Sequence, residues 1–274
     1  MIRWCSYCQA FLGEIPPFDD PRFTHSICPS CEERLERGEN LAEHTAPARS
    51  LLHRLMAKAS HWDESACVAL LDEARASGLS TQSILIGLLK PALYQAGIEW
   101  QNGRMSVASE HRFTSWCDRA LSILESSSQR RGPPDLLILQ APGNSHSLGP
   151  RFAAQILRAR GLSVEVVVPE LPLDEIVAVA KELRPRIIGF SCALPFVVPG
   201  TVDLIQHLRG RLEPGLLCRY VLGGFAFRLG GGAQPLTVAP GIEVVTDLDF
   251  FDSLRAESAE SGPGSAAGAS PSSP

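Results

Sequence analysis

The sequence predicts an α/β protein in which a four-helix bundle precedes a parallel sheet, with a small cysteine-rich module at the amino terminus. Three observations predict this class. Two Cys-x-x-Cys pairs open the chain. Apolar residues then recur at three- and four-residue spacing through four segments, which is typical of amphipathic helices. From residue 135 onward, short apolar runs alternate with helical patterns, as in a parallel sheet with helical crossovers.

The composition is that of a globular protein. The 274 residues are 45% hydrophobic and 20% charged, with a formal net charge of −5. This mildly acidic balance offers no broad electrostatic footprint for nucleic acid. The first residues do not form a charged-then-apolar leader, and no apolar run approaches the length of a membrane span. We therefore expect a cytoplasmic protein with reduced cysteines and no membrane association.

Residues 1–39 are expected to form the cysteine-rich module. The pairs Cys5/Cys8 and Cys28/Cys31 can offer four thiolates to a tetrahedral zinc ion. A redox role or free thiols are the alternatives, and His25 is a possible substitute ligand. The turn-rich spacer over 16–21 leaves the segment too short to build its own core, so metal would replace one. Its few, scattered basic residues favour a protein-contact module over a DNA reader.

Four helices are expected over residues 48–130, after a polar joint at 38–48. The first carries apolar residues from Leu51 to Met56, and the second runs from Ala66 to Ala74 until Gly78 ends it. Ser80 is the expected N-cap of a third helix that extends through Leu89. Ser106 is the expected cap of a fourth, ending near residue 125. Helices of this length form a small antiparallel bundle.

Residues 135–254 are expected to form one parallel sheet after a linker at 126–134. The predicted strands are 135–140, 163–168, 186–192, 219–223 and 243–246, and the predicted helices are 149–161, 172–183 and 200–212. A flavodoxin-like (Rossmann-type) strand order would place the loop after the first strand at the switch point, where ligands bind. That loop, Gly143–Gly149, contains His146, although a lone loop histidine is more often only a surface residue. Residues 255–274 are low in complexity and expected to be disordered.

The loop residues carry a first resemblance to a known family. Asn144, Ser145, His146, Ser147, Leu148 and Gly149 resemble the Asp-x-His-x-x-Gly signature of cobalamin-binding domains. The resemblance implies that His146 replaces the cofactor's own base beneath cobalt. Asn144 stands where the signature has an acid, so the match is His-x-x-Gly preceded by an amide.

A longer resemblance lies in residues 97–111, between the third and fourth predicted helices. They are similar to the Gly-x-x-Trp-x-x-Gly-x-x-x-Val-x-x-Glu-His stretch of cobalamin-dependent photoreceptor repressors. It implies that the bundle covers the upper corrin face and that Trp100, Glu110 and His111 approach the upper ligand. Val107 belongs to the same stretch and is also expected to bind the cofactor. In photoreceptors whose upper histidine ligates cobalt after illumination, that histidine directly follows the Trp. Gln101 occupies this position here, and His111 is the nearest candidate to replace it.

The ends of the third and fourth predicted strands look like the segments that line the cleft for the cofactor's displaced nucleotide tail. The residues that carry this resemblance are Ser191, Ala193, Leu194, Gly223, Gly224 and Phe225. Paired glycines let the backbone approach a ligand closely, because a Cβ atom would clash. Taken alone, a Gly-Gly pair after a strand is often only a turn.

The resemblance covers residues 48–254 and implies a cobalamin-binding sensor, responsive to light, that is not an enzyme. Adenosylcobalamin is the expected form, with methyl- or hydroxocobalamin as alternatives. A corrinoid methyl carrier that serves a methyltransferase is the rival reading, and a scaffold with a vestigial site is the third. The MerR-type DNA-binding domain of the family's repressors is missing, which argues against direct DNA binding. The expected partner is a transcriptional regulator or a second copy of the chain.

Overall fold

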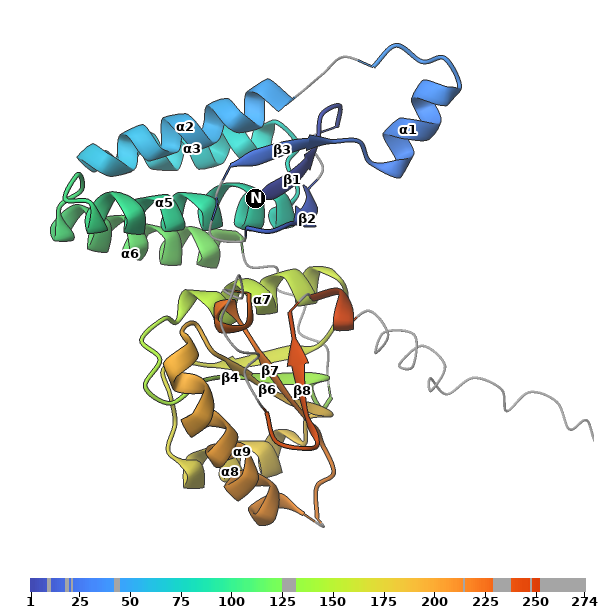
Figure 1. Ribbon diagram of the computed structural model, residues 1–274, viewed down its shortest axis with the longest axis vertical. Helices are drawn as coiled ribbons and strands as arrows, with labels where there is room; N and C mark the ends of the chain where they lie inside the picture. Colours follow the sequence, from blue (N-terminus) through green and yellow to red (C-terminus); the bar gives the residue numbers. More distant parts are fainter. Residues whose placement is uncertain are drawn as a thin grey trace, which may run out of the picture.

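Figure 1 shows the computed structural model of the chain, which describes residues 1–8, 11–17, 20, 22–41, 45–124, 132–213, 215–228, 238–246 and 248–251. Three parts follow one another: a three-stranded sheet with one helix, a helical bundle, and a five-stranded sheet with helices on both faces. The fold class predicted from the sequence is confirmed. Most of the predicted linker and all of the predicted disordered tail lie outside the described residues.

The amino-terminal module is a small sheet with one following helix. Its elements are β1 (Ile2–Cys5), β2 (Phe11–Glu14), β3 (Phe23–Ser26) and α1 (Pro29–Glu36). The strand order is β2-β1-β3, with β1 antiparallel to β2 and parallel to β3. Ile2 and Trp4 on β1 are buried together with Leu79, which precedes the third bundle helix. The module therefore obtains part of its core from the bundle.

Four helical rods form the bundle. They are α2 (Thr45–His61), α3 (Glu64–Ala76), the continuous run α4 (Thr81–Ile84), η1 (Leu85–Leu89) and α5 (Lys90–Gln101), and α6 (Val107–Leu124). Both predicted N-caps are present, because the hydroxyl oxygens of Ser80 and Ser106 accept the backbone N–H groups of Ser83 and Ser109 at 3.0 and 3.1 Å. Gly78 follows α3 with a positive φ of 81°, as expected for a residue that ends a helix.

The third helix runs past Leu89 and ends at Gln101. The stretch 97–111, expected between the third and fourth helices, therefore starts inside the third helix, and the joint to α6 begins at Asn102. The reason lies in the π-helical turn Leu85–Leu89, where the Lys90 N–H donates to Leu85 O, five residues back. A wide turn of this kind lets the helix pass Pro91, which lacks an N–H to donate.

The carboxyl-terminal part is a parallel sheet with the order β5-β4-β6-β7-β8, the predicted flavodoxin-like arrangement. Its strands are β4 (Leu136–Gln140), β5 (Val164–Val167), β6 (Ile187–Ser191), β7 (Arg219–Gly223) and β8 (Ile242–Val245). The helices α8 (Leu173–Leu183) and α9 (Val198–Leu212) cover one face, and α7 (Leu148–Ala159) lies between the other face and the bundle (Figure 1). Because β4 pairs with both β5 and β6, the loop after β4 lies at the switch point.

Two side chains of α7 join the sheet to the bundle. Phe152 and Ile156 are buried in the same apolar cluster as the bundle core, while Ala154 and Leu157 pack with the strands. The α/β part and the bundle thus share a continuous core beside the loop that contains His146. In the part of the chain that the structure describes, no helix is long and apolar enough to cross a bilayer.

Candidate cofactor site

A cavity of about 1090 Å³ lies between the bundle and the carboxyl edge of the parallel sheet. Its size is at the upper end of the range for small-molecule sites, roughly 300–1,000 Å³, and suits a large organic cofactor. The wall is contributed by all three parts of the molecule, since it includes residues of β2, α5 and α6 as well as the strand ends. The site is therefore closed only when the three parts pack together.

The loop after β4 forms the floor of the cavity and is held from behind by Asn144. This side chain is 4% exposed, and its Nδ2 atom donates to Ser191 O at 2.9 Å. That bond fixes the orientation of the amide and directs Oδ1 toward His146. The oxygen accepts the His146 backbone N–H at 3.2 Å and lies 3.2 Å from the ring Nδ1. One buried amide thus sets both the backbone and the ring of His146.

The contact with Asn144 also decides which ring nitrogen of His146 is available. A carboxamide oxygen only accepts hydrogen bonds, so the ring Nδ1 must carry the proton in this arrangement. The lone pair is then on Nε2. Because the side chain of His146 is exposed and lines the cavity, this lone pair is offered to a ligand there. An imidazole held by a hydrogen bond through its second nitrogen is the usual arrangement of a metal-ligating histidine.

The loops that follow β6 and β7 form a second side of the cavity. All six residues predicted there line it: Ser191, Ala193, Leu194, Gly223, Gly224 and Phe225. The physical reason for Gly224 differs from the expected one. Its φ is 116°, and a Cβ atom would lie 2.3 Å from the carbonyl oxygen of Cys192. The backbone of Cys192, rather than a ligand, already requires glycine at this position.

The bundle supplies the opposite side of the cavity. Trp100 lies in the last turn of α5 and is 46% exposed, and Glu110 and His111 lie in the first turns of α6. Glu110 Oε1 accepts the Thr114 hydroxyl at 2.7 Å, and its Oε2 atom is 3.7 Å from His111 Nδ1. The cavity therefore has an imidazole on its floor and an indole, a carboxylate and a second imidazole on its roof.

Two of the predicted cofactor-binding residues do not line the cavity. Asn144 is buried behind His146, where it acts through that residue. Val107 is 54% exposed at the start of α6, one turn before Glu110, and the cavity does not extend to it. The other predicted loop residues, Ser145, Ser147, Leu148 and Gly149, line the cavity together with His146.

Several lining residues have no counterpart among the predicted ones. On α5 they are Lys90, Leu93, Tyr94, Gly97, Ile98 and Gln101, and from distant segments they include Arg3, Glu14 and Arg228. The helix spacing of the first group was a usable signal, because residues three, four and seven apart share one face. For the second group the sequence offered no comparable pattern.

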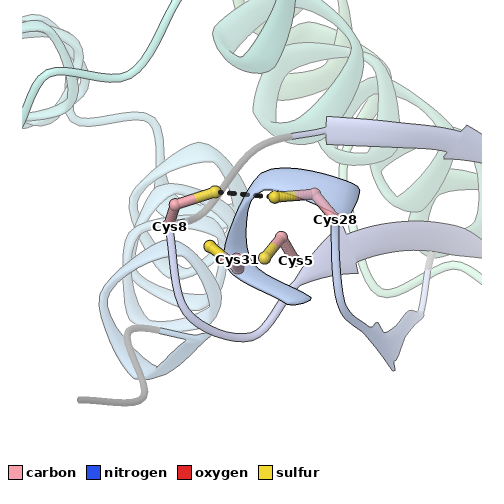
Figure 2. Close-up of side chains that lie close together, drawn as sticks. All are labelled: Cys5, Cys8, Cys28 and Cys31. Carbon is pink, nitrogen blue, oxygen red and sulfur yellow. Dashed lines mark hydrogen bonds between the residues drawn. The ribbon is translucent and has the colours of Figure 1, made fainter. Parts of the chain in front are cut away.

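Figure 2 shows that the four predicted cysteines converge in the amino-terminal module. The sulfur atoms of Cys5, Cys8, Cys28 and Cys31 lie within 4.8 Å of one another, and the Cys8 and Cys28 atoms are 3.6 Å apart. Four thiolates at a zinc–sulfur distance of about 2.3 Å would be about 3.8 Å apart, which is close to this spacing. Burial raises the pKa of the Cys5 thiol, but nearby backbone N–H groups outweigh it and lower the pKa to about 6. The cluster is thus suited to hold a metal ion.

Comparisons with known proteins bear on both large parts of the chain. Residues 51–125 and residues 134–230 match two protein families that are each described as B12 binding domain. The chain is 26% identical over 195 residues to the HTH-type transcriptional repressor CarH of Myxococcus xanthus, across 69% of this chain and 64% of the repressor. It therefore spans slightly less than two thirds of the repressor's length.

Corrinoid proteins are similar as well. The chain is 19% identical over 153 residues to trimethylamine corrinoid protein 1 of Methanosarcina acetivorans, across 54% of this chain and 71% of that protein. The structure of the Methanosarcina barkeri monomethylamine corrinoid protein aligns with a TM-score of 0.58 and 14% identity, across 77% of this chain and 99% of that chain. This structural likeness concerns the fold. Residues 1–50, which include the cysteine cluster, lie outside both family matches.

Proposed function

Because the chain belongs to the family of cobalamin-binding proteins, we propose that it is a cobalamin-dependent sensor that responds to light. The observation that carries the proposal is the cavity itself, with His146 on the floor and Trp100, Glu110 and His111 on the roof. If a corrin is bound in this cavity, His146 would be the side chain that holds its metal, and Trp100, Glu110 and His111 would shield its other side from water. The resident group would supply a cobalt–carbon bond that visible light can break.

The donor set fits this cofactor. Imidazole nitrogen is a suitable ligand for a first-row transition metal such as cobalt, and the Asn144 contact leaves Nε2 of His146 available. The roof and the strand-end loops enclose a cavity of about 1090 Å³, which offers room for a flat macrocycle and a displaced tail. His146 would hold the cofactor from below, while Ser191, Leu194 and the Gly223–Phe225 loop would line the tail cleft.

The roof would control the upper ligand. The indole of Trp100 can exclude water from a weak bond, and Glu110 and His111 can hydrogen-bond an upper ligand that carries hydroxyl groups. Gln101 also lines the cavity, but a carboxamide oxygen is a poor ligand for cobalt compared with imidazole. His111 is 3.7 Å from Glu110 and exposed, so it is the group that would take the position left open after illumination.

A change at the cofactor would be transmitted to the protein surface by a change in the contacts between the bundle and the α/β part. One such contact is between α6 and α7, where Arg151 pairs with Asp118 and donates to the Ser122 hydroxyl at 3.0 Å. Rearrangement of the roof would strain this pair and alter the outer surface of the bundle. We propose a transcriptional regulator or a second copy of the chain as the partner, with antirepressor-like action rather than direct DNA binding.

A methyl carrier of a methyltransferase system is the second candidate, and the likeness to trimethylamine corrinoid protein 1 favours it. Asn144 argues for the sensor. An acid at this position tunes the basicity of the histidine as the metal changes oxidation state, whereas an amide transmits protons poorly. A carrier would transfer its methyl group to an acceptor in darkness, and a sensor would change its spectrum on illumination without one.

The test is the visible spectrum of the purified full chain with adenosyl-, methyl- and hydroxocobalamin, before and after green light. The sensor proposal expects a base-displaced spectrum in darkness and a lasting change after illumination of the adenosyl form. An unchanged spectrum with the adenosyl form, together with methyl transfer from the methyl form to a thiol acceptor, would favour the carrier.

Asn144→Ala is expected to weaken cobalamin binding by about 10- to 100-fold, the usual cost of losing a residue that orients a metal-ligating histidine. The reason is that the His146 ring loses the acceptor that fixes its Nδ1 proton. Isothermal titration with hydroxocobalamin measures the effect, and Asn40→Ala, which removes an exposed amide in the joint after the cysteine-rich module, is the matched control. Equal affinity of both variants and the wild type would show that Asn144 does not orient the ligand.

The cysteine cluster is expected to hold one zinc ion per chain. Elemental analysis of protein purified without chelators measures the content, and Cys5→Ser should lower it while Cys218→Ser, outside the cluster, should not. Chelation should also lower the melting temperature, because metal binding and folding of the module are one process. Protein that contains no zinc and has four titratable thiols in residues 1–39 would contradict the proposal.

A further inference from the structure

The cysteine-rich module forms part of the cobalamin cavity, although it lies outside both family matches. Four of its residues line the cavity: Arg3 on β1, and Leu12, Gly13 and Glu14 on β2. Figure 1 shows the small sheet beside the bundle, at the level where the bundle faces the α/β part. The module is therefore a third wall of the site rather than an appendage.

A buried ionic cluster fastens this wall to both other parts. The Glu14 side chain is 8% exposed, and its carboxylate accepts two hydrogen bonds from Lys90 Nζ at 2.6 and 2.7 Å. The guanidinium of Arg228, which follows the β7 loop in the α/β part, pairs with the same carboxylate. One side chain of the module thus joins the bundle to the α/β part at the rim of the cavity.

The charges in this cluster depend on one another. Burial alone would raise the pKa of the Glu14 carboxyl, but Lys90 and Arg228 outweigh it and hold the pKa below its usual value. Glu14 is therefore ionised at neutral pH and offsets two buried cations. Without it, both buried cations would lose the carboxylate that joins them, and a buried charge left without its partner is strongly destabilising.

A second contact ties the module to the bundle next to its metal site. Trp4, the residue before Cys5, is 1% exposed and packs on Gly87 in the π-helical turn η1. A Cβ atom at Gly87 would lie 1.9 Å from Cζ3 of the Trp4 ring, so only glycine admits the indole. Because η1 continues into α5, the helix that carries Trp100, the position of Trp4 bears directly on the roof of the cavity.

We propose that the cysteine-rich module is a third wall of the cobalamin site and that its metal ion and cobalamin strengthen each other's binding through Glu14 and Trp4. The inference rests on the proposed zinc site and on cobalamin binding, but not on a response to light. Without metal, the short module loses the restraint that holds β1 and β2, and Trp4 and Glu14 leave their contacts. Coupling of this kind is reciprocal. Bound cobalamin must therefore raise the affinity for zinc by the same factor by which zinc raises the affinity for cobalamin.

The wall also has the chemistry to contact the corrin rim, which carries carboxamide side chains. Arg3, Lys90, Tyr94 and Arg228 bring hydrogen-bond donors to this side of the cavity. Glu14 accepts from Lys90 and Arg228, and Arg3 donates to Leu12 O at 2.9 Å. Tyr94 packs against Phe225, with ring centroids 5.1 Å apart, and Lys90 Nζ lies 5.6 Å from the centre of the Tyr94 ring. The donors are thereby held at the rim rather than free to turn into solvent.

The experiment measures the affinity of the full chain for hydroxocobalamin in darkness, with zinc bound and after chelation. We expect removal of zinc to weaken binding at least about tenfold, and cobalamin to slow zinc release to a chelator. Glu14→Gln should weaken cobalamin binding to a similar extent while it keeps one zinc per chain. Its control is Glu39→Gln, which removes an exposed ion pair of the same module.

A second pair of variants tests the Trp4 contact without altering a charge. Gly87→Ala should displace Trp4 and weaken cobalamin binding, whereas Gly210→Ala in α9, where a Cβ meets nothing within 4 Å, should not. Both changes raise helix propensity, so any loss at Gly87 comes from the contact. The proposal is overturned if zinc removal, Glu14→Gln and Gly87→Ala all leave the affinity unchanged. Protein that binds cobalamin but no zinc would overturn the coupling and leave cobalamin binding intact.

Discussion

His146→Ala is expected to weaken cobalamin binding by about a hundredfold or more, because it removes the imidazole on the floor of the cavity. Loss of a residue that only orients a metal-ligating histidine already costs about 10- to 100-fold, and loss of the ligand itself should cost at least as much. His146 is exposed and lies in a loop, so the fold should tolerate the change. The variant therefore separates ligation from stability.

The visible spectrum of the His146→Ala variant shows which group ligates the cobalt of any cobalamin that still binds. With His146 absent, bound cobalamin should show a base-on or water-ligated spectrum instead of a histidine-ligated one. His207→Ala, an exposed histidine on α9 whose Nδ1 contacts Asp203 O, is the matched control and should match the wild type. If the spectrum and affinity of His146→Ala equal those of the wild type, the lower ligand is not His146 and the assignment of the loop fails.

The parallel sheet was predictable because its signal is local. The neighbouring strands β4 and β6 are almost wholly buried runs, and the bounds of strands and helices agree with the predicted ones within two residues. A strand buried on both faces must be apolar throughout, so few other structures compete for such a run. The rule for right-handed crossovers predicted only that the sheet is parallel. The flavodoxin-like strand order was a hypothesis, which the structure confirms.

How the third bundle helix passes Pro91 could not be predicted, because it depends on backbone geometry. Pro91 interrupts the usual hydrogen-bond pattern, and only the wide turn at Leu85–Leu89 lets the helix pass it. That turn is also where Gly87 meets Trp4. Helix periodicity carries no information about a side chain that inserts from another part of the chain.

The residues of the site also fall into two groups, those that a local sequence pattern could locate and those that it could not. His146, Trp100 and the Gly223–Gly224 pair belong to continuous segments, so motif and spacing could locate them. Glu14 meets a lysine 76 positions later and an arginine 214 positions later, and no local pattern links the three. Val107 shows that a matching motif position need not line the cavity. It occupies the right motif position, but the cavity ends one turn short of it.

Trp100→Ala is expected to retain cobalamin but to lose control of the upper ligand. Binding rests mainly on His146 and the tail cleft, and Trp100 is about half exposed on the roof of the cavity, so truncation removes little of the bundle core. What it removes is the large apolar surface that keeps water from the upper bond. The adenosyl form should therefore be less stable in darkness, or the light-driven change in assembly should be lost.

His111→Ala is expected to act at a later stage. If this imidazole takes the place left open by Gln101, the dark spectrum should be that of the wild type and only the spectrum after illumination should differ. The measurements are absorption and size-exclusion chromatography of the adenosyl form before and after green light. Phe196→Ala, which truncates an exposed aromatic residue outside the cavity, and His207→Ala are the controls. Should Trp100→Ala and His111→Ala both behave as the wild type in darkness and after light, the roof residues are ordinary bundle packing. The cavity would then bind cobalamin without a gate, and the case for a light sensor would lose its main structural support.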